Sequence, residues 1–338
     1  MRRNGFTMAE LLVSIAVLSI VSIYLTNMLT RQNRAYVVVE DVTEAQGNAR
    51  AILDILERDL RETAQLAPEG AAVCGVDDTN GPDILYVTRS EVLSFEDDRI
   101  KEYDGLGSPV LAGFNGTGNN EILQLVPALL GQPDPMFRDY DPYHDTDGDG
   151  APDSDFAPGG SVIVVDPDRP ERGAACGVIV TGGLDIVGKR LTVNFDAGGE
   201  NAGLGSNVVV LPATRYSISA DNELLRDGAV LAEGVEDLQV AYFFDQFPQN
   251  GVPDDDEVPG SDGDPVYQPD LFDNSQLREV RISVSVRSRK PDPRLPGAVP
   301  QPLENHLPAA APDGFRRRVV TASVRPRNVG HRPNFDIY

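Results

Sequence analysis

The 338-residue sequence has few basic side chains and few histidines. It contains 29 lysines and arginines against 53 aspartates and glutamates, which gives a formal net charge of −24. We therefore do not expect nucleic-acid binding, because phosphate recognition needs a basic surface. The three histidines, His144, His306 and His331, lie among Pro, Gly and Asp residues. We expect each of them to be a solvated loop residue rather than a catalytic base or a metal ligand.

Familiar enzyme motifs are also missing. The sequence has no G-x-S-x-G, no H-E-x-x-H, no P-loop and no dinucleotide-binding fingerprint. A carboxylate pair for glycoside hydrolysis would need a cleft that a sequence does not reveal. The sequence therefore predicts that the protein is not an enzyme, and a membrane-anchored hydrolase is the weakest hypothesis.

Only two cysteines occur, Cys74 and Cys176. If they lie outside the cytoplasm, oxidising conditions favour a disulfide between them. Such a bond would close a loop of about 100 residues and stabilise the fold by about 4 to 5 kcal/mol in the chain-entropy model. The alternative is two unrelated buried thiols.

Charge, proline and glycine are all absent from residues 11–30. A helix of this length spans about 30 Å, the thickness of the hydrocarbon core of a bilayer. Arg2 and Arg3 precede the run, and no small-residue cleavage site follows it. The sequence therefore predicts a membrane-spanning helix with its N-terminus towards the cytoplasm. Glu10 is unusual because it places a carboxylate at the mouth of the apolar run.

The segment Gly5-Phe6-Thr7, with Glu10 and the apolar run after it, resembles the type IV prepilin signal. The resemblance implies that a prepilin peptidase cuts between Gly5 and Phe6 and methylates the new amine. The charged Phe6 amine of one subunit would then pair with Glu10 of its neighbour inside the lipid, where each charge alone is costly. The alternative is that Glu10 lies at the headgroup boundary of a plain anchor.

The helix is predicted to continue beyond the membrane, since no proline occurs between residues 31 and 67. Apolar residues recur at spacings of three and four, which predicts a stripe that packs against the rest of the protein. These residues are Val38, Val42, Ala45, Ala49, Ile52, Leu53, Leu56 and Leu60. We therefore divide the chain into a leader (1–5), a transmembrane helix half (6–30), an amphipathic helix half (31–67) and a β-rich head (68–338). The alternative for 31–67 is an ordinary linker helix.

The head is predicted to be mainly antiparallel β, so the fold class is α+β, with a long N-terminal helix and long acidic and Pro-rich loops. The strands are predicted at 84–88, 121–126, 161–165, 177–180, 190–195, 207–211, 215–219, 238–244, 279–287 and 318–325. Val280, Ile282, Val284 and Val286 alternate with polar residues, which predicts one buried and one wet face. Residues 291–314 are rich in Pro and Ala and are predicted to form a long exposed excursion.

Several segments of the head resemble minor pilins of the PilW type. They are Tyr216-Ser217-Ile218, Leu224-Leu225-Arg226, the stretch 231–240, Arg281-Ile282-Ser283-Val284 and Arg325-Pro326-Arg327-Asn328. The resemblance implies a type IV pilin-like fold and a role in priming the filament or at its tip. It implies other minor pilins, the major pilin, prepilin peptidase and the inner-membrane assembly platform as partners. It also implies an inner-membrane location with a periplasmic head before assembly, and a place on the cell-surface pilus afterwards. The alternatives are a pseudopilin of type II secretion and a calcium-dependent adhesin on a pilus tip.

Two acidic loops are candidate calcium sites. The first follows the EF-hand spacing, with carboxylates at loop positions 1, 3, 5 and 9 and glycine at position 6. Its predicted ligands are Asp145, Asp147, Asp149, the carbonyl of Ala151, Asp153 and Asp155. Phe156 stands where a bidentate glutamate is usual, so Asp155 or water would replace that ligand. The second loop is a weaker match, with Asp245, Asn250, Asp254 and Glu257 as candidate ligands. The alternative for both is a solvated acidic loop without a cation.

Overall fold

The computed structural model places most of the helix and the strands of the head. The residues that it describes are 8–63, 67, 70–88, 108–109, 119–125, 154, 156–166, 169, 172–197, 208–244, 266–269, 274–292, 294–308, 311–327 and 329.

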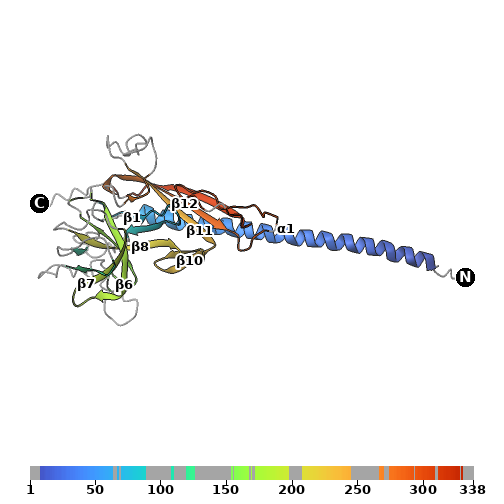
Figure 1. Ribbon diagram of the computed structural model, residues 1–338, viewed down its shortest axis with the longest axis horizontal. Helices are drawn as coiled ribbons and strands as arrows, with labels where there is room; N and C mark the ends of the chain where they lie inside the picture. Colours follow the sequence, from blue (N-terminus) through green and yellow to red (C-terminus); the bar gives the residue numbers. More distant parts are fainter. Residues whose placement is uncertain are drawn as a thin grey trace, which may run out of the picture.

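A single helix, α1 (Met8–Glu62), extends from the head as a long stem (Figure 1). Its 55 residues span about 80 Å at roughly 1.5 Å per residue. The predicted continuity of the membrane half and the packed half is confirmed over this range. At the end of α1, the Thr63 hydroxyl donates a hydrogen bond of 2.6 Å to the carbonyl of Ala72, which ties the last turn to the start of the head.

The C-terminal half of α1 packs on the head along one stripe. The buried residues are Ala45, Ala49, Ile52, Leu56 and Leu60, and Leu53 packs at the margin of the same core. Their spacing of three and four residues places them on one face of the helix. The predicted amphipathic stripe is therefore confirmed from Ala45 to Leu60, whereas Val38 and Val42 are only partly buried, and this packing excludes an ordinary linker helix.

The stripe covers a three-stranded antiparallel sheet of β11 (Val235–Phe244), β12 (Leu277–Arg287) and β13 (Arg317–Val324), in that order. We call it the small sheet. Val280, Ile282, Val284 and Val286 of β12 are buried against α1, as the alternation predicts. The opposite face is not as wet as predicted, because Ser283 and Ser285 are only 3% and 2% exposed.

Among the described residues, the large sheet contains ten antiparallel strands, and its main path runs β1-β2-β8-β5-β6-β7-β4. The strands are β1 (Val73–Val76), β2 (Ile84–Thr88), β3 (Ser108–Pro109), β4 (Glu121–Gln124), β5 (Ser161–Val165), β6 (Ala174–Asp185), β7 (Arg190–Ala197), β8 (Val209–Ile218), β9 (Glu223–Arg226) and β10 (Ala229–Glu233). Strand β3 pairs with β8, and the β9–β10 hairpin is joined to β8 through β9. Figure 1 shows β6 and β7 at the end of the head farthest from the N-terminus.

Strand β8 corrects the prediction of two separate strands at 207–211 and 215–219. Pro212 interrupts the alternation in the sequence, yet the strand continues through it and pairs with Val162 of β5. On the other side of β8, β3 pairs with residues 209–210 and β2 pairs with residues 213–216. Pro212 thus lies in the gap between these two partners, where a missing N–H costs little.

The connection between β12 and β13, residues 288–316, is a long and largely exposed excursion, as predicted, but residues 303–306 pack on the small sheet. We call it the strap. It folds back over the outer face of the small sheet, where Leu303 is 4% and His306 8% exposed. Glu304 receives hydrogen bonds from Arg281 and Ser283 of β12 at 2.6 to 2.9 Å. These contacts explain why Ser283 beneath it is buried.

Candidate functional site

The N-terminal half of α1 presents an apolar surface that nothing in the described chain covers. An 18-residue window has a mean hydropathy of 2.2 and none of it is buried, so α1 is long and apolar enough to cross a membrane. Its large side chains are exposed to between 47% at Met28 and 87% at Met8. An exposed patch of this size indicates contact with lipid or with other helices.

Four hydroxyl groups within this apolar half are satisfied by the helix itself. Ser14, Ser19, Thr26 and Thr30 each donate a hydrogen bond of 2.8 Å to the carbonyl four residues earlier. This arrangement lets these four side chains enter an apolar environment, because their hydroxyl donors do not need water.

Glu10 lies in the first turn of α1 and is exposed. A carboxylate there is favoured by the helix macrodipole, whose N-terminal end is positive. Its oxygens therefore stand at the start of the apolar half, where the predicted pairing with a neighbour requires them. Gly5 and Phe6, the predicted processing residues, lie outside the described part of the chain.

A partly buried polar junction fixes the packed half of α1 to the large sheet. Asp59 of α1 accepts hydrogen bonds from the Tyr216 hydroxyl of β8 at 2.5 Å and from Arg226 Nη2 of β9 at 2.7 Å. Arg226 Nε also donates to the Tyr216 oxygen at 3.1 Å. Burial, followed by the hydrogen bond to Asp59, raises the pKa of the Tyr216 phenol. The phenol therefore remains a protonated donor and sets the rotation of the helix against the sheet.

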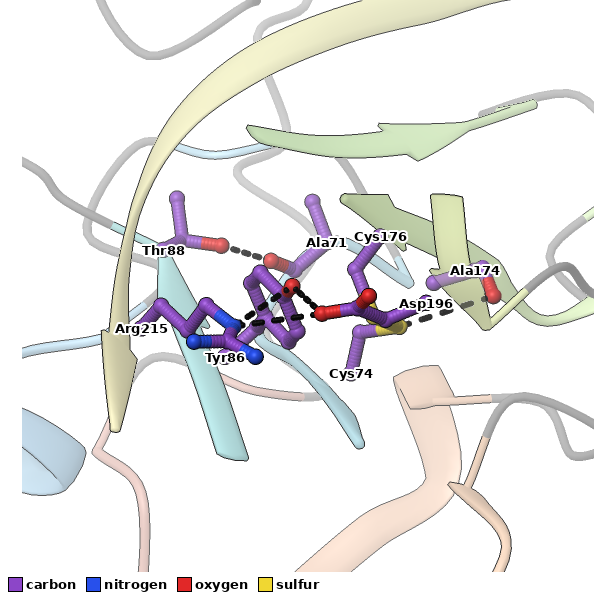
Figure 2. The surroundings of a disulfide bond; sticks show 8 residues. All are labelled: Ala71, Cys74, Tyr86, Thr88, Ala174, Cys176, Asp196 and Arg215. Atoms are coloured by element: carbon purple, nitrogen blue, oxygen red, sulfur yellow. Dashed lines mark hydrogen bonds and ion pairs between the residues drawn. A yellow bond between two sulfur atoms is a disulfide. The ribbon is translucent and has the colours of Figure 1, made fainter. Parts of the chain in front are cut away.

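A second junction closes the large sheet on itself (Figure 2). Tyr86 of β2 donates a hydrogen bond to Asp196 of β7, and Arg215 Nε of β8 lies 3.0 Å from the tyrosine oxygen and 3.1 Å from Asp196. Burial and the charge of Asp196 raise the pKa of the Tyr86 phenol, so the phenol stays a donor. Strands that are far apart in the sheet order are thus brought face to face.

The disulfide between Cys74 and Cys176 lies beside this second junction, as Figure 2 shows. It joins β1 to β6, and the two Cα atoms are 6.1 Å apart. Both cysteines are fully buried, so the predicted bond is present as a core crosslink. It connects the strand that follows α1 to the far side of the large sheet.

The candidate calcium ligands cannot be placed, because Asp145, Asp147, Asp149, Ala151, Asp153 and Asp155 all lie outside the described residues. The same is true of the weaker set, Asp245, Asn250, Asp254 and Glu257. Within the described ranges, no three His, Cys, Asp or Glu side chains are grouped closely enough to hold a metal ion.

His306 corrects the expectation of a solvated loop histidine. Its Nδ1 lies 2.7 Å from Asp237 Oδ2, and the two side chains are 10% and 5% exposed. No local sequence pattern indicates this pair, because the two residues are 69 positions apart. The Asp59 and Tyr86 junctions were missed for the same reason, since their partners are brought together only by the fold.

Two family models match the sequence. Residues 205–328 match that of the Type IV Pilus-assembly protein W, and residues 1–26 match the prokaryotic N-terminal methylation motif. Among solved structures, a type IV-like pilin from Thermus thermophilus covers 87% of this chain and 97% of its own, at 12% identity and a TM-score of 0.31. A search of curated protein sequences gave no match. The first matched segment contains β8 to β13, and the second contains Gly5, Phe6 and Glu10.

Proposed function

We propose that this chain is a PilW-type minor pilin with a prepilin signal, and the two family matches support this proposal. We infer that it acts in type IV pilus assembly as part of a priming or tip complex. The observation that carries this proposal is the division of α1 into two halves. One half is apolar and exposed, and the other is packed on the head along a single stripe. Such a helix offers the same surface to lipid before assembly and to neighbouring helices afterwards.

The chemistry of the N-terminus supports assembly rather than simple anchoring. We propose that prepilin peptidase cuts after Gly5 and methylates the Phe6 amine, which keeps its positive charge. Glu10 of a neighbouring subunit would neutralise that amine in an environment where neither charge is stable alone. The partners are then the major pilin and other minor pilins, which meet this chain through α1 at the inner-membrane assembly platform.

The bulk of the head favours the tip over the shaft. The large sheet and the small sheet both lie at one end of the stem (Figure 1), and the two acidic loops are inserted into this head. A head of this size would be difficult to repeat along a tightly packed shaft. At the tip, only the side of the head that faces the stem needs to contact another subunit.

Calcium binding is a further part of the proposal. We propose that the loop of residues 145–155 holds one Ca²⁺ through its alternating carboxylates, since five of them within eleven residues repel one another when no cation is bound. The ion would order a loop of the head and would supply structure rather than catalysis.

The assembly proposal is tested with Glu10→Ala and Glu10→Gln in a strain that lacks the unmodified gene. Both variants should insert in the membrane at normal levels. Their incorporation into sheared pili should fall at least about tenfold, because an ion pair worth about 1.4 kcal/mol or more in lipid is lost. Glu40→Gln, on the exposed part of α1 beyond the apolar run, is the matched control.

Normal incorporation of both Glu10 variants would reject the pairing. A deletion strain separates the pilus from type II secretion: we expect piliation to be lost and enzyme secretion to continue. Lost secretion with intact pili would instead identify a pseudopilin.

A further inference from the structure

A buried polar cluster ties the strap to the rest of the head. It brings together the turn between β1 and β2, strand β11 of the small sheet, and residues 303–306 of the strap. Its buried members are Asp83, Asp237, Gln239 and His306, which are 3%, 4%, 0% and 8% exposed. None of them takes part in the helix surface or the two junctions described above.

The cluster contains two buried carboxylates with separate partners. Asp83 accepts the backbone N–H of Asp78 at 3.0 Å and that of Val240 at 2.8 Å. Asp237 faces His306 at 2.7 Å. At most one of the two negative charges is therefore matched by a cation within the cluster. A buried charge without such a match favours the uptake of a proton.

Hydrogen-bond acceptors also outnumber hydrogen-bond donors within this cluster. Gln239 Nε2 donates to Asp237 Oδ1 at 3.1 Å and to the Gly81 carbonyl at 2.9 Å, so its amide group lies inside the cluster. Its Oε1 is buried and has no hydrogen-bond partner within the part of the chain that the structure describes. Asn305 is in the same situation, since Nδ2 donates to Asp77 at 2.6 Å while Oδ1 receives no bond from any described residue.

The remaining charged groups around the cluster do not supply the missing positive charge. Asp77 and Asp78, on the β1–β2 turn, add negative charge. On the strap, Glu304 is occupied by Arg281 of β12, whose two nitrogens lie 2.6 and 2.9 Å from it. His306 is thus the one ionisable donor that reaches the buried carboxylates among the described residues.

We propose that this cluster is a proton-operated clasp, which holds residues 303–306 of the strap on the small sheet when it has bound a proton and loosens them when the proton leaves. The clasp responds to pH, and the segment whose position it controls is the strap. The cover over the outer face of the small sheet would then depend on the acidity around the head.

The direction of the effect follows from the acid–base chemistry of the buried groups. Burial raises the pKa of Asp83 from 3.8 to about 7, and it also raises the pKa of Asp237. A carboxyl group with a raised pKa in the closed state binds its proton more tightly there than in the open state. The clasp is therefore strongest below pH 4 and loses strength as the pH rises through about 7.

Hydrogen exchange of the full-length protein in detergent micelles tests the clasp. The reporters are the amides of Leu303 and His306, which donate to each other's carbonyls at 3.1 and 2.8 Å. After correction for the intrinsic exchange rate, their protection should fall by about tenfold or more between pH 5.5 and 8.5. In Asp83→Asn, which cannot ionise at this position, the protection should depend much less on pH over this range.

Asp78→Asn is the matched control, because Asp78 is an exposed carboxylate on the same turn and should leave the pH dependence intact. If Asp83→Asn does not fold, as judged by circular dichroism, Asp237→Asn replaces it with the expectation of a weaker pH dependence. Protection that is constant with pH in the unmodified protein would overturn the proposal. An identical pH dependence in the unmodified protein and in the Asp83 or Asp237 variant would overturn it as well.

Discussion

The junction of Asp59, Tyr216 and Arg226 is expected to be the main polar contribution to docking of α1 on the head. The Asp59 side chain is 12% exposed, and one of its oxygens accepts both the Tyr216 hydroxyl and an Arg226 nitrogen. Hydrogen bonds to a charged group contribute about 1.5 to 3 kcal/mol each. The Arg226 side chain is 42% exposed, so solvent screening reduces its share to below about 1 kcal/mol.

These values predict the result of a double-mutant cycle. Tyr216→Phe should lower the free energy of unfolding by about 1.5 to 2 kcal/mol. Asp59→Ala should lower it by about 2 to 3 kcal/mol, because it also leaves the buried phenol without an acceptor. The double variant should lose less than the sum, with a coupling energy of about 1 to 2 kcal/mol.

The assay is urea unfolding of the full-length protein in detergent micelles, followed by far-ultraviolet circular dichroism because the chain has no tryptophan. Arg58→Ala is the control, since Arg58 lies on the same turn, is 62% exposed and stands 3.6 Å from Asp59. It should change the stability by less than about 0.5 kcal/mol. A coupling energy below about 0.3 kcal/mol would refute the claim that the tyrosine and the aspartate act as a unit.

Two further predictions concern the head. Replacing Cys74 and Cys176 together by alanine should lower the free energy of unfolding by about 4 kcal/mol, because the bond closes a loop across 102 positions. Urea unfolding should give the same free energy for this variant and for the reduced unmodified protein. A loss below about 1 kcal/mol would contradict this prediction. Calcium titration calorimetry of the full-length protein should show binding that Asp147→Ala with Asp149→Ala abolishes and Asp254→Ala preserves. No heat from the unmodified protein would reject calcium at both acidic loops.

The sequence predicted those features that local patterns determine. The stripe from Ala45 to Leu60 and the alternation from Val280 to Val286 were correct, because the periods of a helix and a strand are visible within a few residues. The disulfide followed from the presence of only two cysteines. A local signal for the β9–β10 hairpin was overlooked: Asp227 and Gly228, with φ values of 50° and 81°, form the two-residue turn between these strands.

The features that the sequence did not predict depend on distant residues. Tyr216 and Asp59 are 157 positions apart, and Tyr86 and Asp196 are 110 positions apart. Neither pair leaves a spacing pattern, since contacts between strands of different hairpins depend on sheet order. Burial of His306 and Ser283 was missed for a related reason, because the composition of the strap indicates a loop but not the surface on which it folds.

The arrangement of the large sheet explains why the disulfide lies where it does. Strands β4 to β7 lie outside the segment that matches the PilW family model, and with the start of β8 they form a separate core, which includes Leu123, Val162 and Leu191. The helix, the small sheet and the edge of the large sheet nearest to them share a different core. Cys74 belongs to β1, which follows α1, whereas Cys176 belongs to β6 in the distal group of strands. The bond therefore joins the part of the head that packs on the stem to the part farthest from the N-terminus (Figure 1). A force on the stem would reach the distal strands through this bond as well as through the β5–β8 pairing.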